Sequence, residues 1–341
     1  MKQHTGTFPR IDRRGFLQIV AAAGAAGALW HVGLGPRKPS THTVRRSRTM
    51  MGTQINLIVH GPDQDRCEDA VDSTFARMDE LVGRLSRHNP ESEVSELNSL
   101  GVLTHASRDL RQVLLLADHL SIATEGAFDI TVLPLLELYA RAKADNTMPS
   151  RESIAAALEL VGHRKIAVNN ESITLRRKGM AITLDGIGKG YIVDQGAATL
   201  RSHGFTNVYV EAGGDLMVSG TKSGDRPWRI GVTHPRPGKV RNLVAISISD
   251  RAVATSGDYM QPFTADLRHH HIIDPRTGIS PPELASATVS APTVALADGL
   301  ATAAMVLGPE KSLALLASMP DCEGFFIGKD LRQYRTQGFH G

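Results

Sequence analysis

The stretch LDGIGKGYIVDQ, residues 184–195, decides how the chain is expected to fold. The apolar residues 181–184 predict a short strand, and the residues after Lys189 predict a helix that begins at once. Between them, two glycines and a lysine would present backbone N–H groups and one positive charge at the helix start, which suits a phosphate. The GxxxxGK[ST] spacing is absent, so this is not a Walker loop.

Periodic patterns on both sides of this turn predict the other elements. Alternating apolar residues predict a strand over 53–61, and helical spacing predicts helices over 66–85 and 107–123. A third helix should start at Pro149-Ser150 and end at Gly162, and the last should end at Gly308. Further strands are predicted over 164–169, 172–177, 207–211, 228–233 and 242–249. Helices and hairpins in blocks predict an α+β fold rather than a βαβ alternation.

The N-terminus is typical of an export signal. A twin-arginine pattern, Arg13-Arg14-Gly15-Phe16-Leu17, precedes a weakly hydrophobic stretch rich in Ala and Gly and free of acids. A buried N-terminal helix is the alternative interpretation. We expect residues 1–44 to be a twin-arginine signal and linker, and residues 45–341 to be one domain. The protein would be periplasmic, or anchored on the outer side of the inner membrane if the signal stays uncleaved.

Charge and cysteine content exclude some classes of function. Residues 1–48 hold nine Lys/Arg and one Asp, a net charge of +8 in a chain whose total is +3, so residues 49–341 carry −5. This leaves no basic surface for nucleic acid. Cys67 and Cys322 form no metal-binding spacing, and they could be either a disulfide or two buried thiols.

Several stretches interrupt the core pattern with Gly, Asp and Thr. They are EGAFDITVLPL (125–135), LDGIGKGY (184–191), EAGGDL (211–216), ATSGDY (254–259) and HIIDPRTG (271–278). Asp298 and Thr302 also share one face of the last predicted helix, which by itself is more typical of a solvated or capped face than of a metal site. His269, His270 and His271 cannot all bind one metal if they lie on a strand, because neighbouring side chains point to opposite faces.

Taken together and in this order, these stretches resemble the FAD:protein FMN transferase family, the ApbE-like flavin transferases. The resemblance begins at Met51-Gly52-Thr53, includes LSRHNPESEVSELN (85–98), and extends to about residue 308. It implies a single domain of mixed and antiparallel sheets with packed helices, and an FAD cleft between two subregions. It also implies that the FMN moiety of FAD moves, with Mg²⁺, to a Thr or Ser hydroxyl of a target protein while AMP leaves.

The acceptor would be an exported or membrane-associated redox protein. Two other functions stay open at this point. Water could replace the acceptor hydroxyl, which would make the protein an FAD pyrophosphatase releasing FMN and AMP. The protein could also bind flavin without turnover, although a protein that only binds flavin needs no base.

The resemblance also implies roles for individual residues. The Mg²⁺ ligands would be the Gly186 carbonyl, Asp298 and Thr302, which are the hard oxygen donors that Mg²⁺ prefers. Lys189 would face the FAD pyrophosphate. His271 would take the proton of the acceptor hydroxyl, or would only fix the loop that carries Asp274. The expected FAD contacts are Met51, His88, Ala127, Phe128, Asp129, Thr183 and Ile273.

Two departures from the family pattern concern this site. Thr183 stands where the family usually has Asp, and Asp185, which would share a strand face with Thr183, either takes the place of that acid or disturbs the turn. Ala301 stands where some relatives have a second metal-binding Asp. Fewer charged ligands should weaken Mg²⁺ affinity.

Overall fold

The computed structural model describes residues 41–222, 226–236, 238 and 242–340, so the predicted signal lies outside the described residues. Residues Thr43–Gly341 form one compact unit. The first strand, β1, spans His42–Met50 and so begins within the segment that was predicted to be a linker.

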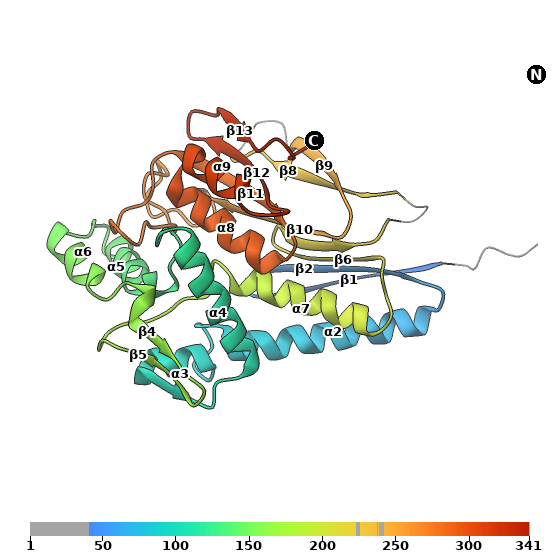
Figure 1. Cartoon of the computed structure of the whole chain (residues 1–341), viewed down its shortest axis with the longest axis horizontal. Coiled ribbons are helices and arrows are strands. Elements are labelled where there is room, and N and C mark those ends of the chain that lie inside the picture. The colour runs from blue at the N-terminus through green and yellow to red at the C-terminus, as the bar shows by residue number, and fades with distance from the viewer. Residues whose placement is uncertain (1–40, 223–225, 237, 239–241, 341) are drawn as a thin grey trace, which may run out of the picture. The chain divides into compact units, whose positions relative to one another are not determined.

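An eight-stranded sheet forms the centre of this unit (Figure 1), in the order β1-β2-β6-β7-β10-β11-β12-β13. Its other strands are β2 (Thr53–Gly61), β6 (Val208–Ala212), β7 (Asp215–Ser219), β10 (Arg251–Gly257), β11 (Leu284–Ala291), β12 (Glu323–Gly328) and β13 (Gln333–Arg335). From β2 to β13 every neighbouring pair is antiparallel. The predicted α+β class with antiparallel sheets is confirmed.

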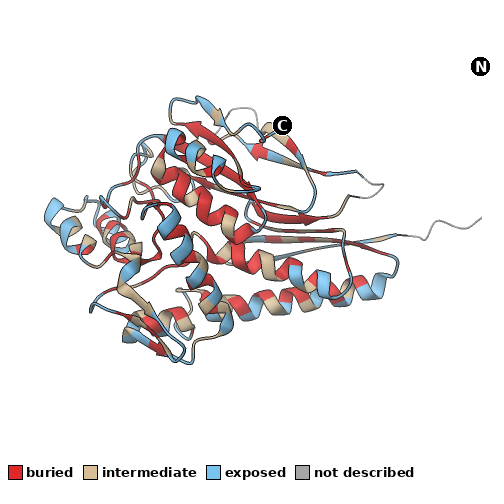
Figure 2. Cartoon of the chain, in the orientation of Figure 1, coloured by how far each residue is buried: buried red, intermediate tan, exposed pale blue. Residues whose placement is uncertain are grey.

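The two faces of the sheet are covered differently. On one face α2 (Gln64–Leu85), α7 (Gly188–Ser202) and α8 (Val294–Leu307) pack side by side (Figure 1). On the other face lies a hairpin of β8 (Trp228–Thr233) and β9 (Asn242–Ile248). Residues alternate between the faces, so Met217 of β7 joins the core under the helices, while Leu216 and Val218 join the core under the hairpin. Both faces of β7 and β11 are therefore buried (Figure 2).

The remaining elements build a second region and the C-terminal edge. They are α3 (Glu93–Leu100), β3 (Val102–Thr104), α4 (Arg108–Ala123), α5 (Leu133–Ala144), α6 (Arg151–Leu158), β4 (Ile166–Val168), β5 (Ser172–Leu175) and α9 (Pro309–Ala317). Strands β3, β5 and β4 form a small antiparallel sheet. Two short 3₁₀ turns, Ile130–Val132 and His163–Lys165, complete this region.

Strongly periodic segments fold as predicted. The strands over 53–61 and 228–233 and the helices over 66–85 and 107–123 are present within two residues of their expected ends, and Gly308 ends α8. The third helix does begin after its Ser150 cap, but it ends at Leu158 rather than at Gly162. Gly162 instead precedes the second 3₁₀ turn, which delays the start of the predicted strand 164–169 to Ile166.

The strand predicted over 181–184 is wrong. This segment pairs with no strand within the described residues, because a side chain satisfies its backbone instead. The Asn98 amide accepts a hydrogen bond from the Ile182 N–H (2.7 Å) and donates one to the Ile182 carbonyl (2.9 Å). The Thr183 N–H donates to the Ile130 carbonyl at 2.8 Å. One asparagine thus does locally what a neighbouring strand would do.

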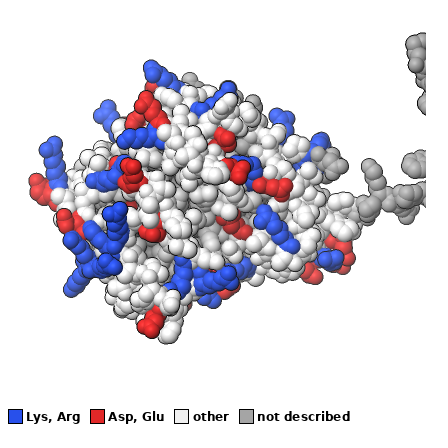
Figure 3. Space-filling view, in the orientation of Figure 1, with Lys and Arg blue, Asp and Glu red and all other residues white. Residues whose placement is uncertain are grey.

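Cys67 and Cys322 are buried free thiols, which decides between the two alternatives left by the sequence. In the described part of the chain, every helix is too short or too polar to span a bilayer. Acidic side chains lie among basic ones on the face of the molecule shown in Figure 3.

Candidate active site

The helices α7 and α8 meet closely at their N-terminal ends. A Cβ atom added to Gly190 would lie 2.6 Å from the Val294 carbonyl oxygen and 2.7 Å from the Ala295 Cα, so only glycine allows this approach. One turn along α7, the Asp194 carboxylate accepts hydrogen bonds from the backbone N–H groups of Val294 (2.8 Å) and Ala295 (2.9 Å). These contacts fix the start of α8 against the start of α7.

Asp298 and Thr302 lie on the face of α8 that meets the turn 184–190. The buried Asp298 carboxylate accepts a hydrogen bond from the Gly190 N–H at 3.2 Å. The Thr302 hydroxyl lies 3.2 Å from the Ser256 hydroxyl of β10. A Cβ atom added to Gly186 would be 3.0 Å from the Thr302 hydroxyl oxygen. The structure therefore brings Gly186, Asp298 and Thr302 together, as the resemblance implied.

Buried charges of both signs surround these residues. The Lys189 ammonium lies 2.7 Å from a carboxylate oxygen of Asp215, a fully buried residue at the start of β7. Burial and, after it, the nearby Asp215 charge raise the pKa of Asp298, Lys189 opposes both, and the resulting pKa is about 8. Burial lowers the pKa of Lys189, but Asp215 and Asp298 outweigh that effect and the net shift is upward.

A divalent cation fits this set of donors. Two buried carboxylates face a single ammonium, so a bound cation would relieve the cost of keeping both ionised. The described residues contain no cluster of three or more His, Cys, Asp or Glu side chains that could hold a metal. A carboxylate, a hydroxyl and a carbonyl suit Mg²⁺, which keeps several of its waters. Ala301 is buried and adds no charge, whereas Asp215 adds a second carboxylate from the sheet.

His271 lies beside the same turn. Its backbone N–H donates to the Gln261 carbonyl at 3.0 Å, and its buried Nδ1 has no partner among the described residues. Burial lowers the pKa of His271. The charge of Asp185 raises this pKa and the charge of Lys189 lowers it, so both charges act on the imidazole. A half-buried imidazole with a lowered pKa is neutral near pH 7, as a proton acceptor must be.

The other two histidines of the run have different surroundings. The segment is irregular, with one bridge between His270 and Pro262, rather than the strand we assumed. The His269 ring stacks on Tyr139 at 6.2 Å between centroids. His270 is fully buried, and burial lowers its pKa to about 3. Only His271 therefore belongs to the candidate site.

The predicted FAD contacts separate into two groups. Phe128 is 3.5 Å from a Cβ built on Gly186, and the buried Thr183 hydroxyl accepts a hydrogen bond from the Asp185 N–H at 3.1 Å, so both border the turn. Ala127 is buried next to Phe128. Three others lie apart from the turn's described contacts: Met51 is half-buried in the β1–β2 turn, His88 is exposed, and Ile273 packs in a small core with Leu135 and Tyr139.

The Asp129 carboxylate accepts three hydrogen bonds, two from its own turn and one from a segment 34 residues away. One carboxylate oxygen accepts from the Thr131 N–H (2.8 Å) and the Thr131 hydroxyl (2.6 Å), and the other accepts from the His163 N–H (2.7 Å). These bonds tie the two 3₁₀ turns together. The structure thus gives Asp129 a positioning role, whereas direct contact with FAD stays a prediction.

Asp185 does not share a strand face with Thr183, which corrects our argument that it takes the place of the family acid. It lies in a turn, and its half-exposed carboxylate accepts from the Arg87 guanidinium at 2.9 Å. Sequence reasoning missed this pair because Arg87 is 98 residues away in the chain. It also missed Asp215 and Ser256, although both lie in Gly- and Asp-containing stretches that the sequence had singled out.

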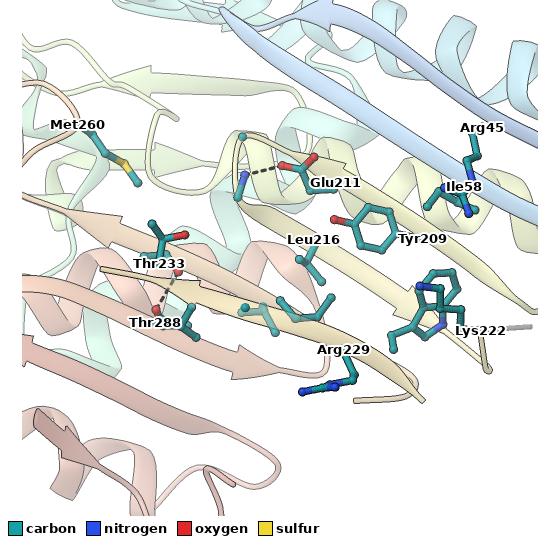
Figure 4. A pocket seen from close by; sticks show the side chains of 18 of the residues that line it. Arg45, Ile58, Tyr209, Glu211, Leu216, Lys222, Arg229, Thr233, Met260 and Thr288 are labelled. Atoms are coloured by element: carbon teal, nitrogen blue, oxygen red, sulfur yellow. Dashed lines mark hydrogen bonds between the residues drawn. The ribbon is translucent and has the colours of Figure 1, made fainter. Parts of the chain in front are cut away.

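Two cavities lie near these elements. One of about 400 Å³ borders Arg87, Asn98, Met180 and Ala181, directly beside the turn 184–190. The other, of about 540 Å³, lies on the hairpin side of the sheet (Figure 4), and none of its described lining residues is a predicted FAD contact. The described residues that line the first cavity include no predicted FAD contact either, so the lining does not favour one cavity over the other as the FAD cleft.

Comparisons with known proteins agree with the geometry. The ApbE family model matches residues 51–326. The FAD:protein FMN transferase of Haemophilus influenzae is 32% identical over 287 residues, which cover 80% of this chain and 83% of the relative. The enzyme of the same name from Vibrio cholerae is 32% identical over 296 residues, with coverage of 82% and 86%.

Solved structures of the same family are similar throughout. Flavin transferase ApbE from Vibrio cholerae superposes with a TM-score of 0.76 at 29% identity, covering 88% of this chain and 99% of that chain. The ApbE protein from Thermotoga maritima superposes with a TM-score of 0.80 at 28% identity, covering 87% and 98%.

The Asp129 bonds lead to a stability prediction. Asp129→Ala should lower the free energy of unfolding by about 3 kcal/mol, because it leaves three buried or half-buried donors without their charged acceptor. Urea unfolding followed by circular dichroism measures this change. A variant of wild-type stability that quenches FAD fluorescence less than the wild type would instead make Asp129 a ligand residue.

Proposed function

The chain belongs to the ApbE family, and on that premise we propose that it is an FAD:protein FMN transferase. It moves the FMN moiety of FAD to a Thr or Ser hydroxyl of a target protein and releases AMP. The observation that carries this proposal is the convergence of Lys189, Asp298 and His271 on the turn 184–190. A protein that only binds flavin needs no unpartnered, neutral imidazole beside a phosphate-binding turn.

The chemistry assigns a task to each of these residues. The acceptor hydroxyl oxygen forms a bond to the FMN phosphorus, the bond from that phosphorus to the bridging oxygen breaks, and AMP leaves with the bridging oxygen. His271 takes the hydroxyl proton. Lys189 offsets negative charge on the phosphate oxygens, and Gly186, which has no Cβ, lets the backbone approach them. Such a transfer depends mainly on positioning and charge stabilisation, which these fixed groups provide.

We propose further that Gly186, Asp298 and Thr302 hold Mg²⁺. When bound, this ion neutralises charge that develops on the phosphate oxygens. Asp298 supplies the only charged ligand of this set. Its burial, together with the neighbouring Asp215, favours binding of a cation because an unpaired buried carboxylate is costly.

One experiment separates transfer from its alternatives. The purified chain is incubated with FAD and Mg²⁺, with and without an extract of host cells that lack this chain. Flavin fluorescence on a protein band after denaturing electrophoresis supports transfer. Free FMN and AMP without a labelled band would instead support hydrolysis, and neither product would support a flavin-binding protein.

The metal proposal predicts a strong effect of Asp298. Asp298→Ala should slow transfer by at least ~10²–10³-fold, because a preorganised charge partner of the phosphate is lost. FAD binding should survive in large part, since much of the FAD surface is apolar and aromatic. Transfer rate is measured against Mg²⁺ concentration, and excess Mg²⁺ should rescue Thr302→Ala better than Asp298→Ala, because a neutral hydroxyl binds a hard cation less strongly.

Asp298→Asn is the matched control for structure, because its amide oxygen can still accept from the Gly190 N–H. It should melt like the wild type and yet transfer as slowly as Asp298→Ala. A folded Asp298→Asn protein with the wild-type rate and Mg²⁺ dependence would place the metal elsewhere.

The proposed base predicts the pH dependence. His271 must be neutral to accept a proton, and burial lowers its pKa below the ordinary value of 6.5, so the neutral form persists to lower pH. The acidic limb of the kcat/KM profile should therefore have its midpoint below pH 6.5 and disappear in His271→Ala, with a loss of ~10²–10⁴-fold at neutral pH. If the acidic limb persists unchanged in His271→Ala, the titration of another group causes it.

We also propose that the protein is exported by the twin-arginine route and acts on an exported or membrane-associated acceptor. Arg13 and Arg14 before the weakly hydrophobic stretch support the first part. Replacing both by Lys should retain the protein in the cytoplasmic fraction, which immunoblots of cell fractions measure. Unchanged arrival in the periplasm would exclude this route, because the general secretion signal needs positive charge rather than arginine.

A further inference from the structure

The cavity of about 540 Å³ lies between β8 and the face of the main sheet that the helices do not cover. Its floor includes the apolar or aromatic side chains of Ile58, Tyr209, Leu216 and Val253 from four different strands. All six residues of β8 line it, whereas no described residue of β9 does. The cavity is therefore a groove along one edge of the hairpin.

This edge of β8 is free. In the described part of the chain β8 pairs only with β9, so the backbone groups on its other side have no strand partner. Such an edge is a template for one more strand. An extended peptide that paired with β8 would lie over the groove floor, with alternate side chains on Ile58 and Tyr209. Six residues of strand correspond to about 20 Å of peptide.

Three positively charged side chains line the groove, two of them at one end. Figure 4 shows Arg45 and Lys222 toward one end, Met260, Thr233 and Thr288 toward the other, and Arg229 between them on β8. Arg45, Lys222 and Arg229 are exposed and make no ion pair with any described residue. An occupant with acidic side chains near these three residues would therefore complement the groove.

The opposite end of the groove adjoins the candidate active site. Gly213 and Gly214 line this end and directly precede Asp215, the partner of Lys189. Thr255 also lines it, and its N–H donates to the Asp215 carboxylate at 3.2 Å. Met260 precedes Gln261, whose carbonyl accepts from the His271 N–H at 3.0 Å. A peptide in the groove would thus end beside the residues that hold the base and the charged lysine.

We propose that this groove binds the acceptor protein through an extended segment that adds to the free edge of β8. The segment carries acidic side chains toward Arg45, Lys222 and Arg229, and its Thr or Ser lies toward Met260. This inference rests on the proposed transferase function and names how its protein substrate is recognised. The leader of this chain is a poor occupant, because residues 1–40 hold six Lys/Arg and one Asp and would be repelled.

The test reverses the three groove charges together. The variant Arg45→Glu/Lys222→Glu/Arg229→Glu is compared with wild type in labelling host extract that lacks this chain, with flavin fluorescence of the labelled band as the probe. We expect labelling to be slower by tenfold or more at low salt, with FAD affinity, measured by fluorescence quenching, within twofold of wild type. The difference should shrink as salt screens the charges.

A matched control makes the same change of charge elsewhere. Arg66→Glu/Arg151→Glu/Lys311→Glu also reverses two arginines and one lysine that are exposed and make no ion pair with a described residue. It should label like wild type. If the groove variant labelled at the same rate as the control variant, the proposed role of the groove would be wrong, whereas the proposed transferase function would still be supported. A wild-type protein that binds FAD and labels nothing would overturn the proposed function itself, and the groove with it.

Hydrogen exchange tests the strand addition directly. The labelled band is identified by mass spectrometry, and that protein is purified as the probe. Its addition should slow amide exchange in residues 229–233, and unchanged exchange there would overturn the pairing with β8. If residues 229–233 are already protected in the free chain and dilution removes this protection, a second copy occupies the groove instead. If deletion of residues 1–40 removes it, the leader does.

Discussion

The reciprocal capping of α7 and α8 determines the position of the candidate active site. Asp194 of α7 accepts from the first N–H groups of α8, and Asp298 of α8 accepts from the Gly190 N–H near the start of α7. The positive ends of two helix dipoles therefore lie together, with two carboxylates between them. This arrangement requires the missing side chain at Gly190, because any Cβ atom there would meet the backbone of α8.

The two faces of the central sheet carry different parts of the proposed function. Asp215 points from β7 toward the helices and Lys189, whereas its neighbour Leu216 points toward the hairpin and the groove. Nucleotide chemistry and protein recognition thus occur on opposite faces of one layer, joined at the ends of β7 and β10. The hydrogen bond from the Thr255 N–H to the Asp215 carboxylate connects them. A substitution in the groove can therefore change recognition of the acceptor without touching the nucleotide side.

The sequence predicts local features of this molecule better than long-range ones. Alternation and helical spacing locate the strand 53–61 and the helix 66–85, because each pattern reflects one buried face. The same reasoning fails at 181–184, where Asn98 replaces the neighbouring strand from 84 residues away. The set of Gly186, Asp298 and Thr302 came from resemblance rather than from spacing. Asp215 and Arg87 could not be assigned their partners, because ion pairs between distant segments leave no periodic pattern.

The open edge of β8 has a consequence for the behaviour of the protein at high concentration. Two copies could pair their free edges, as unprotected strands do when proteins aggregate. A parallel pairing would place Arg229 and Lys222 of one copy near the same residues of the other, and the repulsion between like charges would oppose it. The cations proposed to attract an acidic strand would therefore also oppose this self-pairing, and neutralising them would remove that opposition.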